Sequence, residues 1–448
     1  MFIDFLMEIF RENKKKDAII WQNKIYNFQW LLDRVRHWQE VIKSENIDQG
    51  TVTVLEADFS PNSIALFLAL IEQGCISVPL TSSVEADRSE FINIAQGEVS
   101  FIVEKNENVK ITELPNTANH EYYKKLKQLN HPGLVLFTSG SAGKPKAVVH
   151  DFVGLLEKFK LRRSPARILN FLLFDHWGGL NTMFHTLSNG GTIITVRSRI
   201  PDEICKTIEK NRAEILPTSP TFLNLLLLSE SYKRYNLSSL KVISYGTEPM
   251  PPSTLKRLKE VFPGTKLLQT YGLIEVGVLR TMSKSDDSLW LKFGGEGFQT
   301  RVVDGILQIK APSTMLGYLN AASPFTEDGW FITDDSVEVD DEYIKILGRK
   351  SEIINVGGEK VYPTEVENVI QEMGNVGEVS VYGEKNPITG NIVCAKVRLL
   401  DDEDKKAFVL RLKKYCRERL ANYKVPVKVF ITHDPQYSKR YKKKRRQP

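Results

Sequence analysis

A glycine- and hydroxyl-rich loop with two lysines, FTSGSAGKPK at residues 137–146, has the composition of a phosphate-binding loop. Hydroxyl and backbone N–H groups donate to phosphate oxygens, and glycine lets the backbone approach closely. The loop is not a P-loop, because only two residues separate Gly140 from Gly143, and Lys144 is followed by a proline instead of Ser or Thr. An ordinary polar turn after a strand is the alternative. The candidate phosphate-binding residues are Thr138, Ser139, Gly140, Ser141, Ala142, Gly143, Lys144 and Lys146.

The elements that must position this loop alternate between strand-like and helix-like segments, which predicts an α/β protein with largely parallel sheets. Strands are expected at 51–55, 75–80, 168–174, 192–196 and 242–245, and helices at 62–73, 148–160, 178–187, 201–211, 221–228 and 252–261. From Ile306, short strands and turns predict a small antiparallel module. A new α+β unit begins at Gly348. We therefore expect a large N-terminal domain with flanking helices, residues 1–347, and a small mobile α+β C-terminal domain, residues 348–448.

Composition supports a globular protein, with 42% hydrophobic and 26% charged residues among 448. The longest apolar run, Ile64–Ile71, is too short to span a membrane. The first residues suit an amphipathic helix better than a secretory signal, because acidic residues interrupt the apolar stretch. The four cysteines lie far apart without metal-type spacing, which favours a reduced, cytoplasmic protein without a zinc site.

The net charge of +6 comes from one short segment. Residues 439–446, KRYKKKRR, contain seven cations and no anion, so the rest of the chain is close to neutral. A neutral body argues against a broad nucleic-acid-binding surface. The cationic segment could be a solvated tail, or it could serve a site that it reaches.

Several further motifs follow the phosphate-type loop in order, and together they identify a resemblance. They are GCISVPL at 74–80, SYGTEP at 244–249, QTYGLIE at 269–275, WFITDD at 330–335 and GRKSEIINVGGEKVYPTEVE at 348–367. In this order the chain closely resembles the adenylate-forming superfamily, which includes acyl-CoA synthetases, adenylation domains of peptide synthetases and beetle luciferases. The resemblance covers nearly the whole chain.

The resemblance implies an AMP-forming acid–thiol ligase. ATP would activate a carboxylic acid to an acyl adenylate with release of pyrophosphate, and the acyl group would then pass to a pantetheine thiol. Tyr271 can stack on adenine beside Gly246, Asp335 and Arg349 can bind the ribose, and Glu275 suits Mg²⁺, which takes carboxylates and phosphate oxygens. The implied nucleotide-binding residues beyond the loop are Gly246, Thr247, Glu248, Pro249, Gln269, Thr270, Tyr271, Gly272, Asp335 and Arg349.

The cationic tail resembles the superfamily's terminal Thr-x-x-Gly-Lys-x-x-Arg pattern. Ser438 replaces Thr, Tyr441 replaces Gly, and Lys442 falls on the catalytic lysine. An ammonium group bridging the carboxylate and the α-phosphate would stabilise the charge that develops there. The neighbouring lysines leave the register open, and the rivals to Lys442 are Lys439, Lys443 and Lys444.

Three departures from the pattern could affect activity. Ile274 stands where Thr or Ser is usual, so one hydroxyl toward the α-phosphate is missing. Asp334 replaces a glycine in the ribose motif, and Ser351 replaces the usual Asp or Lys of the hinge. A hinge residue need only absorb a backbone rotation.

The acid pocket is expected around His176, Trp177, Gly178 and Gly179, with His176 as a predicted catalytic residue. The sequence His-x-Gly-Gly-Leu resembles acyl-CoA synthetases, and it favours an uncharged fatty or aromatic acid over an amino acid, although Asp175 could pair with an ammonium group. Trp177, Phe222 and Met250 could form an apolar wall. Gly357, Gly358 and Lys360 resemble the turn beside the pantetheine channel, which serves coenzyme A and the phosphopantetheine of a carrier protein alike.

Two other classes of function stay open. The three departures would suit a degenerate homologue that binds nucleotide without catalysis. The tail alone would suit a nucleic-acid binder, which the neutral body disfavours.

Overall fold

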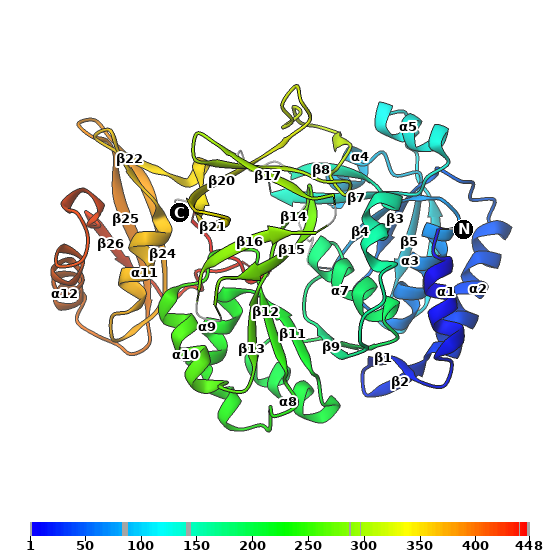
Figure 1. Cartoon of the computed structure of the whole chain (residues 1–448), viewed down its shortest axis with the longest axis horizontal. Coiled ribbons are helices and arrows are strands. Elements are labelled where there is room, and N and C mark those ends of the chain that lie inside the picture. Colours follow the sequence, from blue (N-terminus) through cyan, green and yellow to red (C-terminus); the bar gives the residue numbers. More distant parts are fainter. Residues whose placement is uncertain are drawn as a thin grey trace.

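The computed structural model describes residues 2–82, 88–139, 145–285, 288–295, 297–438 and 440–445, with the backbone alone at Ser139. Two seven-stranded sheets form the bulk of the molecule, with strand orders β13-β12-β11-β9-β10-β1-β2 and β19-β8-β7-β4-β3-β5-β6 (Figure 1). The first is parallel except for the β1–β2 pair, and the second has parallel strands β7-β4-β3-β5 at its centre with antiparallel strands on both sides. Their strands are β1 (Asp17–Trp21), β2 (Lys24–Asn27), β3 (Val52–Glu56), β4 (Ile76–Leu80), β5 (Val99–Val103), β6 (Val109–Glu113), β7 (Gly133–Ser139), β8 (Pro145–Asp151), β9 (Arg167–Asn170), β10 (Thr192–Thr195), β11 (Ile215–Thr218), β12 (Val242–Tyr245), β13 (Lys266–Gln269) and β19 (Gly317–Tyr318).

The helices cover both faces of these sheets. Those before residue 300 are α1 (Asp4–Glu12), α2 (Phe28–Ser44), α3 (Pro61–Glu72), α4 (Arg88–Ile94), α5 (Glu121–Leu129), α6 (Phe152–Leu156), α7 (Trp177–Ser188), α8 (Pro201–Asn211), α9 (Pro220–Ser229) and α10 (Pro252–Val261). Prolines open α3, α8, α9 and α10, where the missing N–H costs nothing and the fixed φ suits the first turn. The predicted bounds of α8 and α10 are therefore confirmed to the residue.

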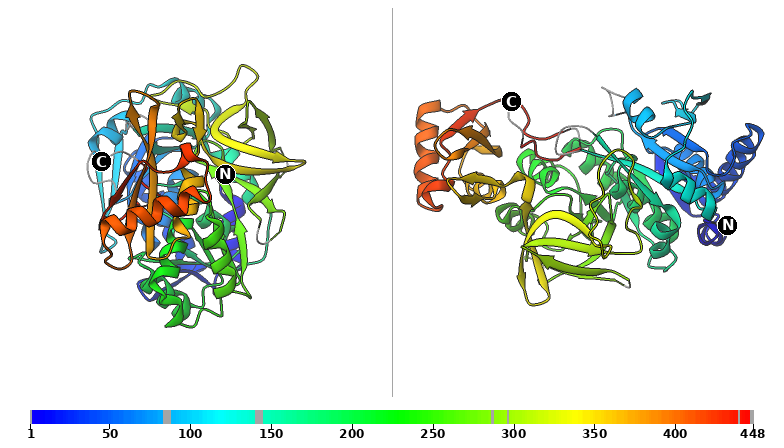
Figure 2. Two further views of the ribbon diagram at one scale, coloured as in Figure 1. Left: turned by 90° about the vertical axis from the view of Figure 1, so that its left-hand side faces the viewer. Right: turned by 90° about the horizontal axis from the view of Figure 1, so that it is seen from above.

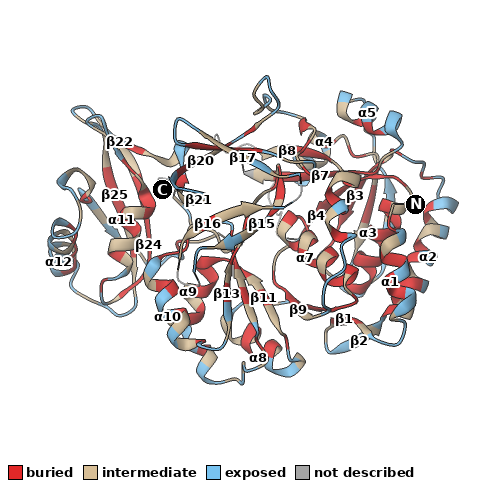
Figure 3. Ribbon diagram, viewed as in Figure 1, coloured by how far each residue is buried: buried red, intermediate tan, exposed pale blue. Residues whose placement is uncertain are grey.

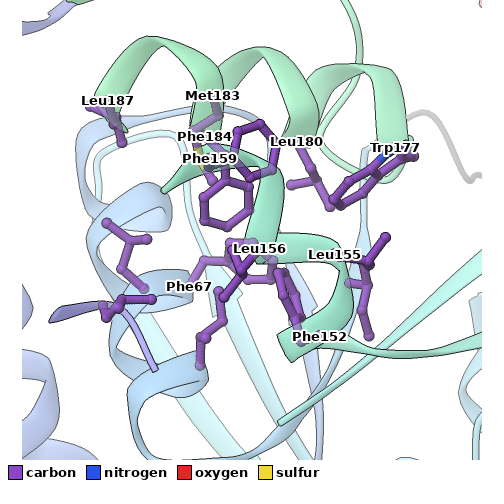
Figure 4. Packing of buried hydrophobic residues seen from close by; sticks show 14 of the residues in the cluster. Phe67, Phe152, Leu155, Leu156, Phe159, Trp177, Leu180, Met183, Phe184 and Leu187 are labelled. Atoms are coloured by element: carbon purple, nitrogen blue, oxygen red, sulfur yellow. The ribbon is translucent and has the colours of Figure 1, made fainter. Parts of the chain in front are cut away.

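The main hydrophobic core lies between the two sheets. It joins α1, α2, α3 and α7 to strand residues of both sheets, such as Ile193 and Leu136. In Figure 4, Phe184 and Leu180 of α7 face Phe152 and Phe67. A second core packs α8, α9 and α10 on the outer face of the first sheet. Figure 3 shows the buried residues concentrated along these layers.

The predicted antiparallel module is a third seven-stranded sheet with the order β14-β15-β16-β21-β20-β18-β17. It begins earlier than residue 306, because β14 and β15 follow the parallel strand β13 directly. Its strands are β14 (Tyr271–Leu273), β15 (Gly277–Ser283), β16 (Trp290–Gly294), β17 (Gln299–Val303), β18 (Ile306–Lys310), β20 (Phe331–Asp340) and β21 (Tyr343–Arg349).

The C-terminal unit has its own sheet and its own core, at one end of the long axis (Figures 1 and 2). After it, the last residues turn back to the large unit, so the C-terminal tail lies between the two (Figure 2). Its elements are β22 (Ile354–Val356), β23 (Glu359–Val361), α11 (Pro363–Gln371), β24 (Val376–Asn386), β25 (Gly390–Leu399), α12 (Lys405–Arg417) and β26 (Lys428–Ile431).

The predicted fold class is confirmed, but one predicted helix is wrong. Residues 148–151 belong to β8, which pairs antiparallel with β7, and the helix α6 begins only at Phe152. Hairpin pairing therefore overrides the helical appearance of this segment. Among the described residues, no helix is long and apolar enough to cross a membrane.

Candidate active site

Tyr271, Asp335 and Arg349 form one hydrogen-bonded group in the third sheet. Asp335 and Arg349 are directly opposite each other on β20 and β21. The Tyr271 hydroxyl donates to Asp335 Oδ2 at 2.5 Å, and Arg349 Nε lies 3.2 Å from Asp335 Oδ1. Burial and the Asp335 carboxylate raise the pKa of Tyr271, so its hydroxyl stays protonated. The structure therefore brings together three residues that the sequence assigned to adenosine.

The turn after β12 lies beside the segment after β13, because these strands are parallel neighbours. A side chain at Gly246 would place its Cβ within 2.6 Å of the carbonyl oxygen of Thr270, so the close approach requires glycine. Thr247 adopts a positive φ of 73°. The Glu248 carboxylate accepts hydrogen bonds from the N–H of Thr221 at 2.7 Å and of Lys443 at 3.3 Å, and so joins α9 to the tail.

Glu275 lies at the junction of the parallel and antiparallel sheets. Its Oε1 accepts a hydrogen bond from the Tyr318 hydroxyl at 2.9 Å. The Lys146 ammonium lies 5.2 Å from the centre of the Tyr318 ring, so the end of the predicted phosphate loop is close to Glu275. Gly140, Ser141, Ala142, Gly143 and Lys144 lie outside the described residues, as does the side chain of Ser139. Thr138 is in β7, just before them.

His176 caps the N-terminus of α7. Its Nδ1 accepts from the N–H of Gly178 at 3.1 Å, which leaves Nε2 to carry the proton. Burial, with Lys442 and Arg440 nearby, holds the pKa of His176 well below its usual range, so the ring is neutral. A Cβ at Gly179 would come 2.0 Å from the Leu173 carbonyl oxygen, which explains the glycine there.

Asp175 is buried and already has partners. Its Oδ2 accepts from Arg440 Nη2 at 2.6 Å and from the Thr81 hydroxyl at 3.1 Å. Arg440 belongs to the tail, 265 residues away in sequence. Asp175 therefore links the acid-side segment to the tail, a role that sequence reasoning missed.

Lys442 reaches the same region from the tail. Burial, Arg440 and Arg349 lower the pKa of Lys442 to about 8, while Glu248 and Glu275 act in the opposite direction. These residues are close enough to influence its charge, so the structure gathers His176, Glu275, Arg349 and Lys442 around one place. The charge of this ammonium is therefore coupled to groups that lie far apart in the sequence.

The described rivals of Lys442 are Lys443 and Lys444, and they have other surroundings. Lys443 Nζ lies 3.1 Å from Glu367 Oε2, and Arg445 contacts both oxygens of Glu367 at 2.9 Å. Arg445 also pairs with Glu352 at 2.7 Å. Glu367, on α11, is completely buried, and Lys444 is exposed. Lys439 lies outside the described residues. Among the described tail lysines, only Lys442 extends toward the site.

Tyr441, which occupies the place of a glycine, has a positive φ of 53°. This left-handed conformation explains why glycine suits the position. The tyrosine ring stacks on Tyr437 and packs against Phe171 and Phe222, and its hydroxyl donates to the Arg199 carbonyl at 2.7 Å. Of the three residues expected in an apolar wall, Phe222 and Met250 belong to the core that packs against Tyr441, and Trp177 belongs to the main core. A wall shared by all three stays a prediction.

Two of the departures contact each other. Asp334 also has a positive φ, 65°, and its carboxylate accepts from the N–H of Ser351 at 3.3 Å. Ile274 is buried in the main core, and its carbonyl oxygen is 2.7 Å from His150 Nε2. Gly357, Gly358 and Lys360 lie exposed in the β22–β23 hairpin.

Comparison with known proteins gives two family matches. The AMP-binding enzyme family matches residues 7–319, and the AMP-binding enzyme C-terminal domain matches residues 365–439. The 2-succinylbenzoate–CoA ligase of Enterococcus faecalis is 26% identical over 93% of this chain and 92% of its own length. The indoleacetate–CoA ligase of Aromatoleum aromaticum is 30% identical over 66% of this chain and 63% of its own.

Solved structures share the fold. An anthranilate CoA ligase in complex with anthranoyl-AMP has a TM-score of 0.82 at 17% identity, covering 98% of this chain and 95% of that one. An o-succinylbenzoate CoA synthetase from Bacillus subtilis has a TM-score of 0.75 at 21% identity, covering 98% and 96%. The resemblance to adenylate-forming enzymes and the expected class of AMP-forming acid–thiol ligase are confirmed.

Proposed function

Because the chain belongs to the AMP-binding enzyme family, we propose that it joins an aromatic or fatty carboxylic acid to the thiol of coenzyme A through an acyl adenylate. The observation that carries the proposal is the convergence of Lys442 with His176, Glu275 and Arg349. A cation placed where charge develops, in a water-poor site, is a strong source of catalysis. Names of the relatives, which are CoA ligases, favour coenzyme A over a carrier protein as acceptor.

The residues divide the work of the first step. Tyr271 would stack on adenine, and Asp335 with Arg349 would bind the ribose hydroxyls. Lys146 and the preceding loop would bind the triphosphate. Lys442 would bridge the attacking carboxylate and the α-phosphate, stabilising the negative charge of the pentacoordinate transition state while pyrophosphate leaves. Neutral His176 would donate from Nε2 to an oxygen of the acid.

Glu275 fits a magnesium ion. Mg²⁺ usually takes one or two carboxylates together with substrate phosphates and water, rather than a full cage of protein ligands. Glu275 offers such a carboxylate near Lys146, with Tyr318 orienting one of its oxygens. When bound, the ion would neutralise charge on the phosphates.

The second step requires that the tail leave. We place the domain boundary at Gly348–Ser351, between residues 1–347 and 348–448, and a rotation there would withdraw Lys442 and bring Gly357, Gly358 and Lys360 toward the acyl adenylate. The three residues are exposed on the C-terminal unit, which suits a surface presented only after rotation. The thiolate of coenzyme A would then displace AMP from the acyl carbon.

An amino acid is a less suitable substrate. A carboxylate free to pair with an ammonium group would be needed, and the nearest candidate, Asp175, is paired with Arg440. Several relatives are named for aromatic acids that carry no amino group, which also favours such an acid over an amino acid.

ATP–pyrophosphate exchange with a panel of aromatic, fatty and amino acids tests the proposal. We expect exchange that depends on acid and Mg²⁺ and that falls sharply in Lys442→Ala, whereas thioester formation from pre-made acyl adenylate survives. Exchange with no acid in the panel would favour the degenerate nucleotide-binding homologue. Exchange only with amino acids would favour the carrier-protein ligase.

A further inference from the structure

Lys158 is a partly buried lysine without an acidic partner. It lies in the short turn after α6, and its ammonium donates to the Asn181 side chain at 2.5 Å and to the Val278 carbonyl at 3.1 Å. Burial and the nearby Arg163 lower the pKa of Lys158 to about 7. An ammonium has three donors, and both of these acceptors are neutral.

The charged group that influences Lys158 is another cation, Arg163. His185 of α7 is influenced by Lys158 and Arg163, and burial with these cations lowers the pKa of His185 to about 4. The adjacent Glu157 pairs with Lys160 instead. Within the described part of the chain, no carboxylate forms an ion pair with Lys158. Buried charges are normally paired, so this arrangement favours an anion supplied from outside.

Lys158 lies close to two segments that the proposed function assigns to the acid and to the phosphates. Its ammonium is 5.7 Å from the ring centre of Trp177, which directly follows His176 on α7, and it touches β15 three residues after Glu275. Lys158 therefore contacts the start of α7, which follows His176, and β15, which follows Glu275. Figure 4 shows Trp177 at the start of α7, with Leu180 beside it and Leu155 facing it, so the surroundings of the indole are apolar.

A second donor in this region also has no partner. Trp177 is 2% exposed, and its indole N–H makes no hydrogen bond with any described residue. A side chain at Gly277 would place its Cβ only 3.2 Å from this nitrogen, so glycine keeps the space in front of the indole N–H open. An unpaired buried donor is costly, and a polar group of a ligand would satisfy it.

We propose that the acid carries a second anionic group, a carboxylate remote from the one that reacts, and that Lys158 pairs with it while the Trp177 N–H donates to a polar group between the two ends. The inference rests on the proposed function and narrows it. The sequence favoured an aromatic or fatty acid with no charged group besides the reacting carboxylate. The substrate inferred here is instead a dicarboxylic acid whose two carboxylates are joined by an apolar segment.

Matched acids separate the second carboxylate from the rest of the molecule. One pair is 2-succinylbenzoate and 4-oxo-4-phenylbutanoate, which lacks the ring carboxylate, and a second pair is adipate and hexanoate. Pyrophosphate exchange gives kcat/KM for each acid with the unaltered chain, Lys158→Met, Lys158→Arg and the control Lys160→Met, an exposed lysine of the same segment.

We expect the dicarboxylate to be preferred in at least one pair, and Lys158→Met to lower its kcat/KM by about 10- to 100-fold, the worth of a hydrogen bond to a charged group. The loss should fall on KM, and the monocarboxylate should be unaffected. Lys158→Arg should retain much of the preference and Lys160→Met all of it.

Preference for the monocarboxylate in both pairs, or an equal loss for both acids in Lys158→Met, would overturn the inference and leave Lys158 a structural residue. Both outcomes are observed only if the protein catalyses pyrophosphate exchange with some acid, so they leave the proposed function intact. Absence of exchange with every acid would instead count against the proposed function.

Discussion

Replacing Arg445 with methionine should disable acyl-adenylate formation although Arg445 itself lies outside the reacting group. Arg445 holds the tail to the C-terminal unit through both oxygens of Glu367 and through Glu352. Glu367 is completely buried and also accepts from the Val381 N–H at 3.0 Å. Lys442, three residues before Arg445, can reach the site only if this anchor holds the chain in register.

The size of the effect follows from the charge on Glu367. Although burial opposes ionisation, Arg445 and Lys443 lower the pKa of Glu367 from 4.5 to about 2. A difference of this size corresponds to about 3 kcal/mol of interaction with the ionised carboxylate. Removing one partner of a buried ion pair costs about 3–5 kcal/mol. If most of this interaction free energy holds the tail in place, the fraction of protein molecules with Lys442 in the site should fall by about 100-fold in the variant.

Single-turnover assays of the two half-reactions measure this directly. Arg445→Met should slow pyrophosphate release by about 100-fold and should slow thioester formation from pre-made acyl adenylate far less. Lys444→Met, which removes an exposed lysine next to Arg445, is the matched control and should leave both rates unchanged. Pyrophosphate release within about twofold of the unaltered rate, or equal losses in both half-reactions, would refute the anchor. Thermal unfolding of each variant shows whether the fold survives.

Four further predictions concern the site. The Lys442 ammonium loses its proton as pH rises through about 8, so adenylate formation should decline above that pH, and a rate that stays flat to pH 10 would contradict the role of Lys442. Glu275→Gln should weaken Mg²⁺-dependent adenylate formation without changing the melting temperature. An unchanged rate and an unchanged Mg²⁺ titration would show that Glu275 does not hold the metal. Tyr441→Ala should slow adenylate formation by about tenfold or more, since a packed ring is lost, whereas Tyr441→Phe keeps the ring and most of the rate. Ile274→Thr should leave the adenylation rate equal or higher, because it supplies the missing hydroxyl; a strong loss would show that apolar packing at this position matters more.

The sequence alone determined the layered α/β fold, and it predicted the residues on the nucleotide side of the site. Local signals carry that information: prolines that open helices, alternating apolar segments, and short motifs in a fixed order. Tyr271, Asp335 and Arg349 could be grouped in this way because each belongs to its own recognisable motif. The strand at residues 148–151 was missed because its partner β7 across the hairpin, and not its own composition, makes it extended.

Only the tertiary structure distinguished the surroundings of the described tail lysines, with Lys443 paired to Glu367 and Lys442 influenced by Glu275 and Arg349. Four lysines within six residues are equivalent by composition, and nothing local distinguishes Lys442 from Lys443. The choice depends on Glu367, 76 residues before Lys443, and on Asp175, 265 residues before Arg440. Such pairs form when the chain folds back and buries carboxylates that must then be neutralised. A buried charge takes whichever cation the fold brings within reach, so the register of the tail depends on the packing of distant elements rather than on its own sequence.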